Sequence, residues 1–316
     1  MSARIGFGCA SLGSRVSAKA GTRALMRAFD AGVTWFDVAP SYGDGAAETI
    51  LGAALAGRRD HVTLCTKVGI LPPAPSLARR LAKPLLRTAL SLAPQLRQHV
   101  RRHRPAAVKP PLVASAIEPG IEASLRRLGT DHVDVLALHD AAVEEVVRDD
   151  VLRALERVVT AGKARRISIA SSVPAVLAGI AASDIFSVAQ VANNVSQRDF
   201  DALLPRLPAC REITTVTHTV FGADGLIDRT ADTVRNTPDL AAILNEAGYD
   251  GDALQQARSF LSDFAFASNE RGVVLLSMFS AGHLEANLVR LSQAPDRDVV
   301  LTIADRISEI GNLFSS

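Results

Sequence analysis

The chain has 316 residues, of which 48% are hydrophobic, so it can bury the core of one large α/β barrel or of two ordinary domains. A single domain over residues 1–316 is the simpler interpretation. The longest apolar stretches are far shorter than the roughly 20 residues of a membrane helix, and the first residues lack the pattern of a signal peptide. These features predict a soluble, cytoplasmic protein with no transmembrane segment.

Strand-like runs recur along the chain, and most gaps between them carry Ala and Leu at helical spacing. In order, the runs are RIGFGC, TWFDVA, VTLCTKV, VDVLALH, RRISIAS, FSVAQVA, EITTVTHTV and GVVLLSM. Their nearly continuous apolar character is typical of parallel strands that are covered on both faces. Helices are expected at 21–31, 46–56, 117–128, 149–161, 252–268 and 299–312. Glycines that suit a left-handed cap stand where four of these helices should end: Gly32, Gly57, Gly129 and Gly162. The pattern predicts an α/β fold, a (β/α)8 or TIM barrel.

One segment, from Leu71 to Leu112, interrupts this alternation of strands and helices after the third strand. It holds nine basic and no acidic residues together with eight of the 15 prolines, so it carries +9 while the rest of the chain carries −7. Part of it has leucines at four-residue spacing and is expected to form an amphipathic helix that prolines interrupt. This basic insertion could pack on the barrel with its arginines in water, cover the barrel mouth and attract an anion, or sit on acidic lipid or a partner. Nucleic acid is not an expected partner, because the insertion has no aromatic residue to stack on bases.

Four polar residues close or follow the first apolar runs: Asp37, Tyr42, Lys67 and His139. In a barrel of parallel strands the carboxyl ends meet at one rim, which would bring these side chains together. A tyrosine has a reference pKa of ~10, so acid chemistry near neutral pH requires a neighbour such as an ammonium group that stabilises the phenolate. An aspartate can hold that ammonium by an ion pair, and a histidine can orient a substrate oxygen. Each residue alone also has a structural explanation, but together they indicate proton-coupled chemistry.

The cysteines and the other metal-binding residue types do not indicate a metal site. Cys9, Cys65 and Cys210 are an odd number and widely spaced, so we expect buried, reduced thiols rather than disulfides or zinc ligands. A metal-dependent hydrolase that uses Asp37 and His139 is disfavoured, because no other strand end supplies a third ligand.

Several of these segments resemble the aldo-keto reductase superfamily. The stretch GTRALMRAFDAGVTWFDVAPSYGDGAAETILG, residues 21–52, is similar to the family's first helix, second strand and second helix, with Asp37, Tyr42, Glu48 and Gly52 on its motif. The segments TKVG and EASLRRLGTDHVDVLALHD carry Lys67 and His139. The resemblance implies an NAD(P)-dependent carbonyl reductase or alcohol dehydrogenase that transfers a hydride between the nicotinamide C4 and a carbonyl or alcohol carbon. It implies that Tyr42 delivers the proton, that Lys67 and Asp37 lower its pKa, and that His139 orients the carbonyl.

The same resemblance implies the residues that bind the cofactor. Ser171 and Gln190 would hold the nicotinamide carboxamide, although Ala170 replaces one hydrogen-bonding residue of the family's pair. His218 and Phe221 are candidates for the ring that stacks on the nicotinamide. After the last strand, the resemblance assigns the cofactor's phosphate and adenine to Ser277, His283 and Asn287. Ser277 and His283 stand where many members have Lys and Arg, so the choice between NADPH and NADH stays open.

The chain departs from the family at its first strand and at the carboxamide contacts, and one alternative function stays open. The family's opening hairpin is missing, because Arg4 already begins the first barrel strand, so another element must close the barrel floor. The altered carboxamide contacts leave room for a catalytically silent binding or regulatory protein of the same fold. For an enzyme, the scarcity of aromatic residues and the arginines of the insertion favour a polar or sugar-like small-molecule carbonyl substrate. The sequence does not determine the oligomeric state.

Overall fold

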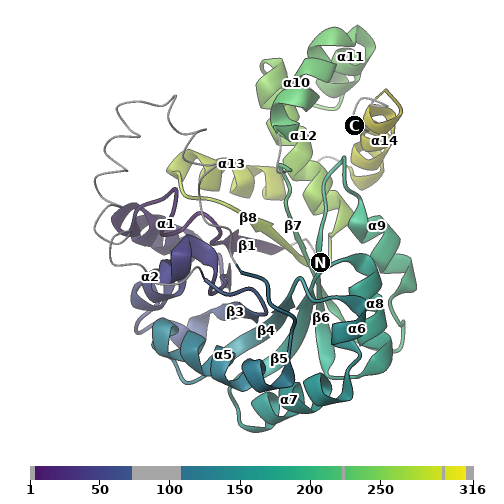
Figure 1. Cartoon of the computed structure of the whole chain (residues 1–316). Coiled ribbons are helices and arrows are strands. Elements are labelled where there is room, and N and C mark those ends of the chain that lie inside the picture. The colour runs from purple at the N-terminus through teal and green to yellow at the C-terminus, as the bar shows by residue number, and fades with distance from the viewer. Residues whose placement is uncertain (1–3, 73–107, 223–224, 294–295, 311–316) are drawn as a thin grey trace.

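The computed structural model describes residues 4–72, 108–222, 225–293 and 296–310 (Figure 1). In this part of the chain, eight parallel strands form one closed barrel in the order of the sequence. Their bounds are β1 Arg4–Gly8, β2 Trp35–Asp37, β3 Thr63–Val68, β4 Val133–His139, β5 Ala164–Ala170, β6 Phe186–Ala192, β7 Thr214–His218 and β8 Val273–Leu276. The predicted TIM barrel is confirmed, and each strand lies within the run that predicted it except β5, which begins one residue earlier, at Ala164.

Helices cover the outside of the barrel, as Figure 1 shows. They are α1 Ala18–Asp30, α2 Ala46–Ala54, α5 Ala114–Leu128, α6 Val143–Val146, α7 Asp149–Thr160, α8 Val173–Ala182, α9 Asp199–Leu203 and α13 Ala281–Ser292. Short 3-10 turns lie at η1 Tyr42–Gly45, η2 Arg59–His61 and η3 Leu204–Arg206. Four glycines just beyond helix ends have φ between 68° and 88°, which confirms the predicted left-handed caps: Gly32, Gly57, Gly129 and Gly162.

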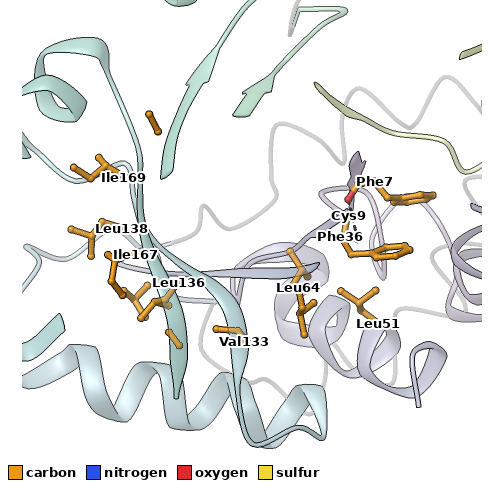
Figure 2. Close-up of a cluster of buried hydrophobic side chains, with 14 of the residues drawn as sticks. Phe7, Cys9, Phe36, Leu51, Leu64, Val133, Leu136, Leu138, Ile167 and Ile169 are labelled. Carbon is orange, nitrogen blue, oxygen red and sulfur yellow. Dashed lines mark hydrogen bonds between the residues drawn. The ribbon is translucent and has the colours of Figure 1, made fainter. Parts of the chain in front are cut away.

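The main hydrophobic core lies between the outer faces of the strands and the surrounding helices. Figure 2 shows part of it, in which Phe7 and Phe36 from β1 and β2 lie beside Leu51 of α2. Burying one such side chain stabilises the fold by about 1.5–3 kcal/mol, so this layer is the main source of stability. All three cysteines are free; Cys9 and Cys65 are buried as expected, whereas Cys210 is exposed, so its predicted burial is wrong.

The amino end of the barrel interior is filled by side chains from the strands themselves. Arg166 on β5 places its guanidinium carbon 5.9 Å from the centre of the Trp35 ring and donates from Nη1 to Thr214 Oγ1 at 3.1 Å. Trp35 is 4% exposed. This Arg166–Trp35 pair therefore occupies the amino end of the barrel interior.

A second hydrophobic cluster lies beyond the carboxyl end of β7, in a helical lobe that stands above the barrel in Figure 1. The lobe comprises α10 Leu226–Asn236, α11 Pro238–Glu246, α12 Ala253–Ser268 and α14 Arg297–Ile310. Phe221 packs against both this cluster and the barrel core, which joins the two. The sequence predicted α12 and α14 but not α10 and α11, because α10 is rich in Thr, Asp and Arg, and α11 has only nine residues.

The two ends of the basic insertion lie side by side. Leu71 N donates to Val108 O at 2.8 Å, and Val108 N donates to Leu71 O at 3.3 Å, which forms a single antiparallel bridge. Residues 73–107 lie outside the described residues, and so do the amphipathic helix and the mouth cover expected there. None of the helices in the described ranges combines the length and the hydrophobicity of a membrane-spanning segment.

Candidate active site

Lys67, at the carboxyl end of β3, is the centre of a buried polar cluster. Its ammonium group forms an ion pair with Asp37 Oδ1 and lies 3.3 Å from the Tyr42 hydroxyl oxygen. It also donates to the Val38 carbonyl at 3.4 Å. Asp37 and Lys67 are 3% and 2% exposed. Charges buried to this degree require partners, and each supplies one for the other.

Strand register explains why these residues meet. Asp37 ends β2 opposite Cys65, and Lys67 lies two residues further along β3, on the same face. Tyr42 begins the 3-10 turn that follows β2, and its backbone N–H bonds to Ala39 O at 3.0 Å. Gly43 continues this turn with φ +61°, and a Cβ there would lie 2.3 Å from Leu12 O, so only glycine fits. The turn thereby directs Tyr42 back over Lys67.

His139 ends β4 and faces Tyr42. The two ring centres are 6.0 Å apart with an interplanar angle of 89°. Its Nδ1 atom is buried and has no hydrogen-bond partner among the described residues. A buried polar atom without a partner costs free energy, so this imidazole is suited to accept or donate a bond to a bound molecule. All four predicted catalytic residues are therefore brought together at one point of the rim.

The pKa of Tyr42 is shifted in the opposite direction from the one expected from the sequence. Burial raises the pKa of the Tyr42 phenol, the Lys67 ammonium lowers it, and the Asp37 carboxylate raises it. The net pKa lies above the usual value of tyrosine, so the expected net lowering is wrong, as is the expected direct contribution of Asp37. Lys67 acts in the expected direction. The phenol is protonated at neutral pH, which is the form that can donate a proton.

The charges of the neighbouring groups are also determined by burial. Burial acts to lower the pKa of Lys67, but the Asp37 carboxylate and the other groups around it outweigh this effect and raise that pKa, so the ammonium stays charged. Burial, and next the positive charge of Lys67, lower the pKa of His139 to about 3. His139 is therefore a neutral imidazole at neutral pH, with one nitrogen as donor and the other as acceptor.

Of the residues expected to hold the nicotinamide, Gln190 and His218 lie on the inner face of the barrel rim. Gln190 donates from Nε2 to Asp37 Oδ2 at 3.1 Å and is 2% exposed. Ser171, by contrast, already donates its hydroxyl to Ala141 O at 2.7 Å. Phe221 packs between the two hydrophobic clusters. The structure therefore places Gln190 and His218 near the buried polar cluster around Lys67 and gives Ser171 and Phe221 other contacts.

The segment expected to bind the cofactor's adenosine end joins β8 to α13. Ser277 is exposed and donates to Gly8 O at 3.3 Å, and Ser280 caps α13 by accepting from His283 N at 3.1 Å. His283 is exposed, whereas Asn287 is 6% exposed. Exposed polar side chains beside the start of a helix fit a phosphate-bearing ligand.

Arg27 is a residue near this segment that the sequence did not indicate. Its Nη2 donates from the last turn of α1 to Phe279 O at 3.2 Å. The sequence near Arg27 does not indicate this contact, because α1 and α13 become neighbours only when the barrel closes between β8 and β1.

Two motif residues serve packing rather than chemistry. Glu48 is fully buried and accepts from Thr66 Oγ1 at 2.6 Å and from Arg127 Nε at 2.6 Å, which ties α2 to β3 and α5. Gly52 allows close approach of the same two helices, since a Cβ there would lie 2.1 Å from Leu128 O. The motif around Tyr42 therefore also encodes the position of α2.

A metal centre has no candidate ligands in the part of the chain that the structure describes, where no three His, Cys, Asp or Glu side chains are grouped to hold an ion.

Comparison with known proteins identifies the family. Residues 4–304 match the model of the Aldo/keto reductase family, so the chain belongs to that family. It is 32% identical over 149 residues to a 6-dehydroglucose reductase of Agrobacterium fabrum, with 45% of this chain and 40% of the relative covered. It is 30% identical over 218 residues to a D-threo-aldose 1-dehydrogenase of a Pseudomonas species, with 67% and 63% covered. The matched regions thus span less than two thirds of the length of these relatives.

Solved structures share the fold. An aldo-keto reductase of Bacillus halodurans in its holo form superposes with a TM-score of 0.68 at 19% identity, over 95% of this chain and 91% of that chain. An aldo-keto reductase of Klebsiella pneumoniae in complex with NADP and acetate gives a TM-score of 0.68 at 22% identity, over 96% and 90%. At this identity the likeness supports the barrel architecture.

Proposed function

We propose that the chain is an NAD(P)H-dependent oxidoreductase, a carbonyl reductase or alcohol dehydrogenase acting on a polar, sugar-like substrate. One observation carries the proposal: buried Lys67 contacts both Asp37 and Tyr42, and His139 faces the same tyrosine. This arrangement provides a proton donor, a charge that stabilises the donor after it has lost its proton, and a neutral group that can orient a carbonyl oxygen.

In the reducing direction, a bound reduced nicotinamide would supply the hydride for the carbonyl carbon. Tyr42 donates its phenolic proton to the carbonyl oxygen, which gives the alcohol. Lys67 stabilises the resulting phenolate from 3.3 Å, and Asp37 holds the ammonium in place. His139, being neutral, hydrogen-bonds the carbonyl oxygen and directs its carbon toward the hydride. The phenolate then recovers a proton from solvent.

Relatives support the substrate class and the cofactor. The two curated relatives are named for 6-dehydroglucose and for D-threo-aldoses, both sugar-like molecules. The Klebsiella pneumoniae structures contain NADP or NADPH. NADPH and NADH are both candidates for this chain, because Ser277 and His283 offer polar contacts to the cofactor but no permanent positive charge. The cytoplasmic location expected from the sequence stays a prediction.

The test is cofactor oxidation with a panel of aldehydes, ketones and aldoses, compared between the natural chain and Tyr42→Phe. General acid catalysis contributes about 10²–10⁴-fold, so the variant should lose at least a hundredfold in turnover while cofactor binding remains. Tyr249→Phe is the matched control, since Tyr249 is the chain's other tyrosine and lies in the helical lobe. Undiminished turnover in Tyr42→Phe would refute the proton-donor role.

A second candidate, a catalytically silent binding protein, is favoured by the contacts of Ser171. Its hydroxyl donates to Ala141 O, and its neighbour Ala170 has no polar side chain, so this pair offers a nicotinamide fewer hydrogen bonds than the resemblance implies. Tight cofactor binding without turnover on any carbonyl of the panel would support this candidate over the enzyme.

A further inference from the structure

Asp140 directly follows His139 and has a backbone conformation that few residues adopt. Its φ is +57°, in the left-handed region, which aspartate and asparagine tolerate better than other residues that carry a side chain. Its backbone N–H donates to Ala170 O, at the end of β5, at 2.7 Å. The backbone beside the imidazole is therefore held in one conformation, with the carboxylate of Asp140 at the rim of the barrel.

Lys109 contacts this carboxylate from the carboxyl end of the basic insertion. Its Nζ donates to Asp140 Oδ2 at 2.7 Å. Lys109 directly follows the antiparallel bridge that joins the two ends of the insertion. Beyond it, Leu112 N donates to Glu145 Oε1 at 2.7 Å, and Leu112 O accepts from Arg148 Nη1 at 3.3 Å. Because the backbone is attached on both sides of Lys109, its ammonium group is held beside the end of β4.

A small hollow in the surface brings this ion pair together with His139. Its lining includes all three of these residues and also Gly69, which follows β3. Gly69 has φ +121°, and a Cβ there would lie 3.0 Å from His139 O, so glycine allows the chain after β3 to pass this close. A molecule whose oxygen is oriented by His139 would therefore lie next to a carboxylate and an ammonium group.

The ion pair keeps unused hydrogen-bonding capacity on both of its members. An ammonium group has several N–H donors and a carboxylate has two acceptor oxygens, so a single contact leaves most of them available. Within the described ranges, the contact through Oδ2 is the one hydrogen bond that these two side chains make. The side chains of Lys109 and Asp140 are 47% and 59% exposed, so a ligand can reach them. An exposed pair of this kind adds little stability, so the fold does not depend on it.

We propose that Asp140 and Lys109 recognise a hydroxyl group adjacent to the carbonyl of the substrate, an inference that rests on the proposed function. A hydroxyl group can donate to Asp140 Oδ1 and accept from Lys109 Nζ at the same time. The pair has no net charge, so it suits a neutral polyhydroxylated molecule better than an anion. Because Asp140 directly follows His139, the hydroxyl group it binds is on the carbon next to the carbonyl. The substrate class is therefore the α-hydroxy aldehydes and ketones, which include the open-chain forms of sugars.

The test compares glyceraldehyde with propionaldehyde, which has the same carbon chain without hydroxyl groups. The measured quantity is kcat/KM for glyceraldehyde divided by kcat/KM for propionaldehyde, in the natural chain and in each variant. Lys109→Met and Asp140→Gly each remove one partner, and glycine suits the left-handed backbone at position 140. Each variant should lower the ratio about tenfold or more, mainly through a higher KM for glyceraldehyde. Lys109→Arg keeps a donor and the ion pair, so it should retain most of the ratio.

Lys163→Met is the matched control. Lys163 forms a comparable ion pair with Glu122, 2.6 Å from Nζ to Oε1, and it directly precedes β5, so it lies at the opposite end of the barrel. This variant should leave the ratio unchanged. Glycerol gives a second measurement that needs no turnover of a hydroxylated substrate. It should compete with propionaldehyde in the natural chain and more weakly in Lys109→Met and Asp140→Gly.

Three outcomes would overturn this inference while the proposed function stands. The ratio could be unchanged in both variants, or the natural chain could reduce propionaldehyde but not glyceraldehyde. The natural chain could also prefer glyceraldehyde 3-phosphate and lose this preference in Lys109→Met, which would show that the ammonium group binds an anion. A natural chain that acts on no carbonyl compound would instead refute the proposed function and the inference together.

Discussion

Gln190 donates a hydrogen bond to Oδ2 of Asp37 at 3.1 Å, while Oδ1 of the same carboxylate pairs with Lys67. Both oxygens of a buried carboxylate are therefore held, one from β3 and one from β6. We therefore expect Gln190 to act as a positioning residue for the proposed active site, because the orientation of Asp37 affects where the Lys67 ammonium lies relative to Tyr42.

Replacing Gln190 with leucine should weaken both stability and catalysis. Oδ2 of Asp37 would lose its partner while staying buried, which costs about 1–3 kcal/mol in the free energy of unfolding. A less constrained carboxylate holds Lys67 less firmly, so turnover should fall by about tenfold or more. Urea unfolding and initial rates at saturating cofactor would measure the two effects. Unchanged kcat with reduced stability would show that the contact is only structural.

In Gln190→Glu, the hydrogen bond to Asp37 should depend on pH. The activity of the variant should then depend on pH in a way that a purely structural role would not produce. At neutral pH the new carboxylate would repel Asp37, whereas at lower pH it takes up a proton and can donate to Oδ2 as the amide does. The activity of this variant relative to the natural chain should therefore rise as the pH falls. A ratio that does not change between pH 8 and pH 5 would contradict the role of the Gln190 donor.

Acid should destabilise the fold through His139 and His218. Both pKa values are lowered, to about 3 and about 4, from about 6.5 in the unfolded chain. Between these values the unfolded chain binds more protons than the folded protein, so stability is greatest above pH 6.5 and is lost as the pH falls toward the folded pKa values. At pH 5 each histidine costs at most about 2 kcal/mol relative to neutral pH.

Urea unfolding at pH 7 and pH 5 would check this dependence. The difference in unfolding free energy between the two pH values should shrink in His139→Asn and in His218→Asn. His283→Asn, an exchange at an exposed position outside the Lys67 cluster, is the control variant. Equal pH dependence in all the variants would show that carboxylates alone govern the loss of stability.

Much of the barrel could be predicted because its signals are local. The run VDVLALH predicts β4 at Val133–His139 without reference to any other segment, and the residue that closes such a run lies at the rim. Asp37, Lys67 and His139 were identified in this way. The helix α8, by contrast, was not predicted, because VPAVLAGIAA is apolar on all faces and shows no helical periodicity.

The contacts that complete the site could not be predicted in the same way. Gln190 is 153 residues from Asp37 in the sequence, and the two meet only because the barrel closes. Thr219 O accepts a hydrogen bond from Asn194, which lies in the loop after another strand. The sequence also does not show that the pKa of Tyr42 is raised, because this depends on how deeply the phenol is buried. Burial outweighs the charge of Lys67 at this position. Such features depend on distances through space rather than on residue type.

Gly52→Ala should destabilise the fold although alanine favours helices. Gly52 lies within α2, and its added methyl group would lie 2.1 Å from Leu128 O, a backbone atom that cannot rotate away. Overpacking of this kind costs about 1–3 kcal/mol, which exceeds the gain in helix propensity of about 1 kcal/mol. Gly282→Ala is the matched control, since nothing lies within 4 Å of a Cβ there, and it should be neutral or slightly stabilising. Thermal unfolding would compare them, and equal Tm values would contradict the close approach of α2 and α5.

Asp263 of α12 and Arg290 of α13 form an ion pair that connects the helical lobe to the helix carrying His283 and Asn287. Asp263 is fully buried, and the Arg290 guanidinium carbon lies 5.0 Å from the centre of the Tyr249 ring. Burial raises the pKa of Asp263, and the hydrogen bond and charge of Arg290 act in the opposite direction. We therefore expect this pair to help position α13.

Arg290→Met should cost about 3–5 kcal/mol in the free energy of unfolding, because it leaves a buried carboxylate without its partner. The double variant Asp263→Leu with Arg290→Met removes both charges and should recover most of that loss. Urea unfolding would measure the coupling, and titration with 2′-phospho-ADP-ribose, which lacks the nicotinamide, would report whether α13 keeps its position. If the double variant regains stability but still binds this ligand weakly, the ion pair positions α13 for the cofactor. If the single variant is as stable as the natural chain, the pair contributes nothing and the hydrophobic cluster alone holds the lobe.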